Sequence, residues 1–159
     1  MTTFLHHHFK VAGWSSGRSL PIASIVPMNH PAAAVLQEFG GLTVGIEEAG
    51  EECARTTVTF CSVELDAEIV RWQGLLSTHL VGVAHVSGGH ADLFLAADGR
   101  CFGRSCVHDA FYFEGSDFYE AIERIVRGQR AQPMLRPDQD SVSLYGEVFR
   151  RGDAALYDY

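Results

Sequence analysis

Apolar side chains recur every three or four residues in four stretches of the chain, a spacing that predicts amphipathic helices. The four stretches are residues 3–12, 31–39, 65–78 and 117–127. In the third stretch this spacing places Trp72 on the apolar face of the helix, so we expect its indole ring to lie in the core.

Capping signals mark the ends of two of these helices. Pro31 stands in the first turn of the second helix and Gly40 follows its last residue, as is typical of a helix start and a helix end. For the last helix, Ser116 is the expected N-cap and Gly128 the expected C-cap.

Between the helices the chain is rich in β-branched and aromatic residues, which favours strands. We expect strands over residues 42–47, 55–63, 79–86, 91–97 and 100–104. Residues 107–113 form either a further strand or an extended lead-in to the last helix. The pair Asp98-Gly99 predicts a tight hairpin between two of these strands.

The pattern changes after the last helix. Residues 129–141 contain two prolines and several polar residues, which predicts a linker or a surface arm. Residues 142–159 regain apolar side chains and are expected either to dock or to be ordered by a partner. We therefore assign residues 1–128 to one domain and residues 129–159 to a C-terminal arm.

The net charge of the chain limits the kinds of partner that we expect it to bind. The chain carries 20 acidic and 12 basic residues, a net charge of −8. Residues 47–70 concentrate this excess, with seven acidic residues against Arg55. Such a charge repels nucleic-acid phosphates and favours encounter with a basic protein, although it also suits a solvated, solubility-giving surface.

Localisation is inferred from three further patterns. No apolar run is long enough to span a bilayer, and no secretory leader is apparent at the N-terminus. Four cysteines without close pairing are typical of free thiols in a reducing compartment. We expect a cytoplasmic protein that does not bind membranes.

No motif of a known catalytic site occurs. The phosphate-binding loop, the serine-hydrolase elbow and the zinc-deaminase pattern are all missing. The remaining enzymatic alternative is a small metal-assisted hydrolase using His85, His90, Cys101 and His108. Its cysteines lack the short pair spacing of structural zinc sites, so we expect no metal and no cofactor, and a protein that is not an enzyme.

The run from Asp109 to Glu120 alternates acidic with aromatic residues, a combination that suits a basic protein surface. The alternative is a strand-to-helix connection whose rings fill the core. Together with the acidic turn at residues 47–52, this run supplies the expected partner-binding residues. They are Glu47, Glu48, Glu51, Glu52, Asp109, Tyr112, Glu114 and Asp117.

Four segments, in their order and spacing, resemble the third subgroup of the SUKH superfamily of bacterial immunity proteins. They are AGWSSGR at 12–18, HPAAAVLQEFGGL at 30–42, LVGVAHVSGGHADLFLAADGRCFG at 80–103 and SDFYEAIERIVRG at 116–128. The chain departs from the family pattern at residues 19–30, where a Trp-containing helix is usual and a short segment with two prolines stands instead.

The resemblance implies a single α+β domain in which helices pack around an antiparallel-rich sheet. It further implies a non-enzymatic immunity protein that binds and neutralises a cognate toxin domain, often one that acts on nucleic acids. An acidic inhibitor suits the basic groove of such a toxin. Two other hypotheses stay open: a protein-binding module with a regulatory or scaffolding role, and the metal-assisted hydrolase.

Overall fold

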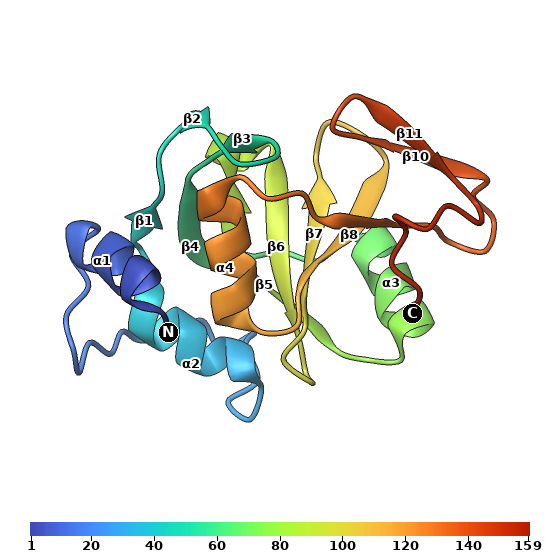
Figure 1. The fold of residues 1–159 in the computed structure, drawn as a ribbon. Helices are drawn as coiled ribbons and strands as arrows, with labels where there is room; N and C mark the ends of the chain where they lie inside the picture. The colour runs from blue at the N-terminus through green and yellow to red at the C-terminus, as the bar shows by residue number, and fades with distance from the viewer.

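A seven-stranded antiparallel sheet forms the centre of the computed structural model, which describes residues 1–159, with strand order β1-β4-β5-β6-β7-β8-β9 (Figure 1). The strands are β1 Thr43–Val44, β4 Val58–Val63, β5 Leu80–Val86, β6 Ala91–Ala96, β7 Cys101–Ser105, β8 Ala110–Gly115 and β9 Gln132–Met134. Two hairpins lie outside this sheet. They are β2 Glu48–Ala49 with β3 Ala54–Arg55, and β10 Ser141–Leu144 with β11 Glu147–Arg150.

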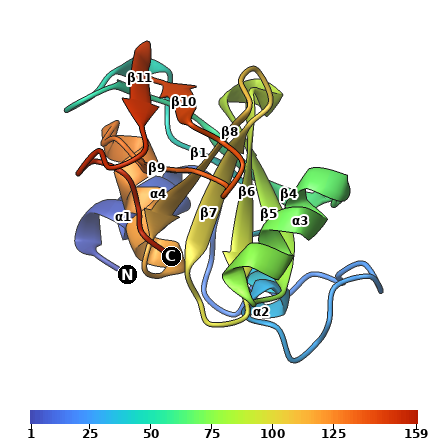
Figure 2. The ribbon, with the colours of Figure 1, turned by 90° about the vertical axis from the view of Figure 1, so that its right-hand side faces the viewer.

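Helices cover both faces of the sheet. On one face lie α1 Thr3–Val11, α2 Pro31–Phe39 and α4 Phe118–Arg127, and on the other lies α3 Ala67–Leu76 (Figure 2). A short 3₁₀ helix, Ser87–Gly89, joins β5 to β6. The four helices lie where the apolar spacing predicts them, and the α+β fold with an antiparallel-rich sheet is confirmed.

The larger core lies between the sheet and the three helices on its first face. At its centre the ring of Phe39 in α2 lies 4.4 Å from that of Phe9 in α1 and 5.8 Å from that of Phe60 in β4. Aromatic rings at such separations bury large apolar areas with favourable edge and offset contacts. This core therefore fixes the positions of α1 and α2 relative to the sheet.

The smaller core lies beneath α3. Trp72 is 0% exposed, and its ring stacks on Phe111 of β8 at 4.5 Å. Ile69 and Leu76 of the same helix are buried beside it. The prediction that Trp72 is a core residue is confirmed.

The acidic segment differs from its predicted form. Strands were expected over residues 42–47 and 55–63 with a turn between them, but β1 ends at Val44 and the turn is a separate hairpin. The chain bends at Gly45, whose φ is +88° and where a Cβ would lie 2.4 Å from the Thr56 carbonyl oxygen. Only glycine fits this bend, and it ends the strand early.

The N-cap of α4 also differs. Asp117, rather than Ser116, is the N-cap, and its carboxylate accepts hydrogen bonds from the N–H groups of Tyr119 at 2.8 Å and Glu120 at 3.0 Å. Ser116 stands one residue too early to reach these donors. Gly128 is the C-cap as predicted, with a φ of +69°.

Residues 129–159 are part of the folded structure. Three residues of the expected linker form β9, which pairs with β8 and is the last strand of the sheet. The hairpin β10–β11 packs on the same strand around Tyr112. The tail covers the open edge of the sheet, because the Tyr157 N–H donates to the Pro133 carbonyl oxygen at 2.9 Å.

Trp72→Ala should lower the free energy of unfolding by about 3–5 kcal/mol, because the substitution leaves a large cavity under α3. Urea unfolding measures this cost. Val70→Ala on the same helix is the matched control, because Val70 is 54% exposed and its truncation should cost far less. Equal costs for the two variants would contradict the assignment of Trp72 to the core.

Candidate functional site

Residues 47–55, which contain β2 and β3 and which we name the acidic hairpin, carry four glutamates and one arginine. Glu48 and Arg55 face each other across its two strands and form an ion pair of 2.5 Å. Glu47 accepts a hydrogen bond from the Thr56 hydroxyl group at the base of the hairpin. This hydrogen bond is the main reason why the pKa of Glu47 lies below its ordinary value. The carboxylate is therefore ionised at neutral pH.

The acidic hairpin is seated on the C-terminal end of α4. The N–H of Glu51 donates to the Arg127 carbonyl oxygen at 3.0 Å. The N–H groups of Glu52 and Cys53 donate to the Gly128 carbonyl oxygen at 2.8 and 2.9 Å. The last carbonyl groups of a helix have no partners within it, so the hairpin completes the hydrogen bonding of α4.

Two glycines allow this close approach. A Cβ on Gly128 would lie 2.4 Å from the Cys53 carbonyl oxygen and 2.8 Å from the Cα of Gly50. A Cβ on Gly50 would lie 2.7 Å from the Arg127 carbonyl oxygen. All three distances are shorter than side chains tolerate, so the seat of the hairpin requires glycine at both positions.

Side chains reinforce the seat. Glu51 binds the Arg127 guanidinium at 3.3 Å and the Gln129 amide at 2.9 Å, and the amide is the main cause that lowers its pKa. Glu52 accepts a hydrogen bond from the Arg130 N–H at 2.7 Å. We expected these glutamates to lie on a turn, where they can reach a partner. They are exposed to solvent as expected, but each is already bound to the rest of the fold.

Asp117 places further negative charge at the opposite end of the same helix. Asp117 makes the capping bonds described above. Close to it, Glu120 accepts a hydrogen bond from the Ser116 N–H at 2.8 Å. Carboxylates at a helix N-terminus are stabilised by the helix dipole. Because α4 has 10 residues and rises about 1.5 Å per residue, these acids lie roughly 15 Å from the acidic hairpin.

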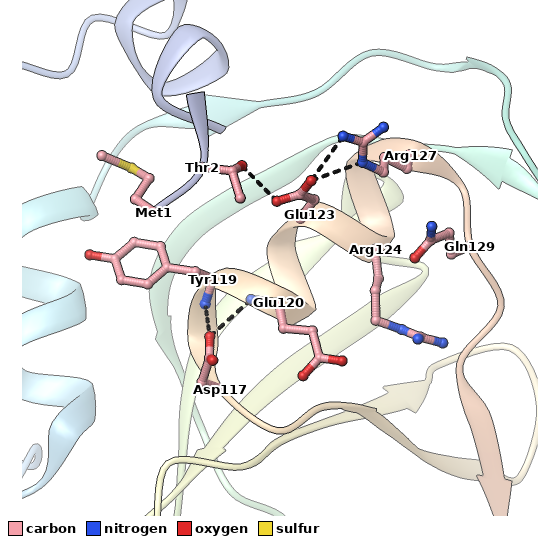
Figure 3. Close-up of a pocket in the computed structure, with 9 residues that line it drawn as sticks. All are labelled: Met1, Thr2, Asp117, Tyr119, Glu120, Glu123, Arg124, Arg127 and Gln129. Atoms are coloured by element: carbon pink, nitrogen blue, oxygen red, sulfur yellow. Dashed lines mark hydrogen bonds and ion pairs between the residues drawn. The ribbon is translucent and has the colours of Figure 1, made fainter. Parts of the chain in front are cut away.

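A shallow pocket of about 400 Å³ runs along the outer side of α4 between these two ends (Figure 3). The first two residues of the chain line one side, and side chains of α4 line the other. Glu123 crosses the pocket: it accepts a hydrogen bond from the Thr2 hydroxyl at 2.6 Å and pairs with Arg127 at 2.9 Å. We name the acidic hairpin, the outer side of α4 and this pocket the α4 surface.

Tyr119 supplies the aromatic ring of the pocket. Its ring packs against Phe118 at 5.3 Å and edge-on against Phe39 at 6.5 Å. Burial raises the pKa of Tyr119, and the carboxylates of Glu38 and Asp117 raise it further. A neutral phenol beside carboxylates suits a lysine or arginine side chain of a partner. The apolar spacing of α4 places position 119 at the border of the core face of this helix. That position is the sequence signal that could have identified Tyr119 as a surface residue.

Three expected partner-binding residues lie outside this surface. Tyr112 and Glu114 of β8 are buried, with 8% and 4% of their surfaces exposed, so the expectation that they contact a partner is wrong. Asp109 is exposed, but it binds Arg136 at 3.0 Å together with Glu68 of α3 on the other side of the molecule. The alternation of acidic and aromatic residues did not reveal that Tyr112 and Glu114 are buried, because both faces of β8 are covered.

The structure does not gather the four residues of the hydrolase hypothesis. The Nδ1 of His85 hydrogen-bonds to the buried Asp92 carboxylate at 2.7 Å, whereas Cys101 lies in the larger core. His90 and His108 are exposed. No group of three or more histidine, cysteine, aspartate or glutamate side chains is arranged to hold a metal ion.

Comparison with known families covers α4 and every strand of the sheet except β9. A model of the SUKH-3 immunity protein family matches residues 5–128. The chain belongs to the SUKH-3 immunity protein family. The α4 surface lies almost entirely within the matched residues, whereas β9, β10 and β11 follow them. No curated protein and no solved structure matched the chain.

Membership of the SUKH-3 immunity proteins places this chain in a class that neutralises toxins. None of its helices combines the length and the apolar character that crossing a bilayer would demand. In this SUKH-3 protein the site that the geometry offers is thus a surface built on one helix, with charged side chains at both ends and an aromatic ring at its N-terminal end.

Gly128→Ala should unseat the acidic hairpin and lower the free energy of unfolding. The matched control is Gly99→Ala, because Gly99 also has a positive φ, +96°, but no atom lies within 4 Å of its added Cβ. The control should show only the backbone cost, about 1–2 kcal/mol, and Gly128→Ala should cost at least about 1 kcal/mol more. Urea unfolding of both variants tests this, and equal costs would show that the close contact is unimportant.

Proposed function

We propose that this SUKH-3 immunity protein neutralises a toxin domain by binding it with the α4 surface. The observation that carries the proposal is the seat of the acidic hairpin on α4, which joins Glu51 and Glu52 with Asp117 and Tyr119 on one helix. The proposed toxin domain is basic and acts on nucleic acids in the cytoplasm. The proposed action is occlusion of its active site, without catalysis by the immunity protein.

Electrostatics supports this choice of partner. An enzyme that acts on nucleic acids presents a basic groove to the phosphates of its substrate. An acidic protein surface is drawn to the same groove and, once bound, excludes the substrate. The net charge of −8 and the acidic hairpin both favour such an encounter.

The α4 surface is also held in place before binding. Glu51, Glu52 and Glu120 each accept a hydrogen bond from the fold, so little side-chain freedom remains to be lost on binding. The same bonds partly satisfy these carboxylates, so their contribution to affinity is reduced. We therefore assign the acids mainly to steering and the Tyr119 ring mainly to retention of the complex.

The proposal is tested with an inactive form of a toxin domain, taken from a neighbouring gene that encodes one. Glu51→Gln, Glu52→Gln and Glu120→Gln together keep the hydrogen-bond acceptors but remove three charges. Because steering depends on charge, association should slow several-fold at low salt and become less dependent on salt. Stopped-flow or surface-based kinetics at two salt concentrations measure this, and growth of cells that express the active toxin reports protection.

A matched control removes three charges elsewhere. Its three substitutions are Glu64→Gln, Asp140→Asn and Asp158→Asn. The residues that they replace are exposed and lie outside the α4 surface. This control should associate at nearly the wild-type rate. Equal slowing in both triple variants would show that only the net charge of the protein affects association. A wild-type protein that neither binds the toxin nor protects cells would overturn the proposed function.

Tyr119→Ala should raise the dissociation rate about tenfold or more while leaving the association rate nearly unchanged, because it removes the aromatic anchor. Tyr119→Phe keeps the ring and its packing on Phe118, and it should keep most of the affinity. Dissociation rates of the two variants from the inactive toxin domain decide the matter. An unchanged rate for Tyr119→Ala would remove this residue from the interface.

A further inference from the structure

His30 is a buried histidine outside the α4 surface, with 6% of its surface exposed. It is the N-cap of α2, and both of its ring nitrogens are engaged. Nδ1 lies 3.1 Å from the backbone nitrogen of Ala32, and Nε2 lies 3.1 Å from the carbonyl oxygen of His79. One ring therefore connects the start of α2 to the segment just before β5.

These two contacts fix the protonation state of the ring. A backbone N–H can only donate a hydrogen bond, and a carbonyl oxygen can only accept one. Nδ1 must therefore be the unprotonated acceptor for Ala32, and Nε2 must carry the proton that is donated to His79. His30 is thus a neutral imidazole in a single tautomer, and the contacts alone set this state.

The cap on α2 depends on this one ring nitrogen. Pro31 has no N–H group, so the N–H of Ala32 is the first donor of the helix, and Nδ1 of His30 is its partner. The contact on the other side is broader, because the His79 carbonyl oxygen also accepts a hydrogen bond from the Ala97 N–H at 3.0 Å. Loss of Nδ1 as an acceptor therefore affects α2 more than the start of β5.

The ionisable groups that face the ring from neighbouring segments are His79 and Asp98. The His79 ring stands edge-on to it at 5.5 Å, and Asp98, which lines the shallow pocket beside His30, is paired with Arg100 at 2.8 Å. Burial is the main reason why the pKa of His30 lies below its ordinary value. The contact with the His79 carbonyl oxygen raises this pKa, and positive charge on the His79 ring lowers it.

We infer that His30 is an acid-sensitive lock on the N-terminus of α2. When Nδ1 takes up a proton from solvent, it becomes a donor that faces the Ala32 N–H, and the capping bond is lost. The new positive charge also stands at the positive end of the helix dipole, which disfavours it. Nε2 keeps its proton and its contact with His79, so protonation opens the start of α2 and leaves the β5 side in place. The lock does not depend on the proposed function.

NMR of the free protein tests the lock without a toxin. Spectra of the imidazole nitrogens should show His30 with its proton on Nε2 at pH 7.5. As the pH falls to 5, the protection factor of the Ala32 amide in hydrogen exchange should drop several-fold, with the same midpoint as the His30 ring, because the cap is lost. The Ala97 amide is the internal control and should keep its protection, because its bond to His79 is not broken.

Two substitutions separate the contacts of the ring. His30→Asn places an oxygen at the position of Nδ1 and cannot be protonated there, so the protection of Ala32 should no longer depend on pH. His30→Gln keeps a donor for the His79 carbonyl oxygen but no acceptor at the position of Nδ1, so the protection of Ala32 should be low at both pH values. His90→Asn removes an exposed histidine and should behave as the wild type.

Three results would overturn the lock. They are a proton on Nδ1 of His30 at pH 7.5, pH-dependent protection of Ala32 that persists in His30→Asn, and an equal loss of protection at Ala97, which would indicate unfolding of the whole region. If the variants do not fold, the tautomer and the midpoints of the wild-type protein still decide, because unequal midpoints for the His30 ring and the Ala32 amide contradict the coupling.

Stability gives an independent readout with a definite sign. The folded-state pKa of His30 lies below its ordinary value of 6.5, so the unfolded chain holds this proton more tightly than the folded protein. The contribution of the neutral ring is therefore complete above pH 6.5 and declines as the pH falls toward the folded-state pKa. The free energy of unfolding of the wild type, relative to that of His30→Asn, should fall over that window, and a constant difference down to pH 5 would contradict the lock.

Discussion

The open carbonyl groups at the C-terminus of α4 impose a constraint on the surface that we assign to toxin binding. A helix end cannot satisfy these groups by itself, and burial without partners would be costly. Here the N–H groups of residues 51–53 supply the hydrogen bonds, and Gly50 and Gly128 permit the approach. The most acidic segment of the chain is thereby held against a helix that is itself anchored in the larger core.

This arrangement reconciles two demands on an acidic surface. Like charges repel one another, so several carboxylates gathered on a small protein destabilise it unless they find partners. Glu48, Glu51 and Glu123 find theirs in Arg55 and Arg127, while Asp117 binds the N–H groups at the start of α4. Most of these carboxylates are still exposed, so the field that steers a basic partner is kept along with the fold.

The segment after residue 128 lies beyond the residues that the family model matches, but it is part of the folded structure. Its strand β9 covers one side of β8, and its hairpin buries Tyr112. Glu114 of the same strand is buried, and burial raises its pKa to about 8.

Local patterns in the sequence were sufficient for the helices, for the Asp98-Gly99 hairpin and for the burial of Trp72, because spacing and capping act over a few residues. They could not reveal that Glu51 pairs with Arg127, 76 residues away. Nor could they show that both faces of β8 are covered, which buries Tyr112 and Glu114 and leaves Tyr119 as the available ring. The sequence by itself determined the elements and the excess of charge. Tertiary structure alone decided which of those charges and rings share one surface, because that depends on contacts between segments far apart along the chain.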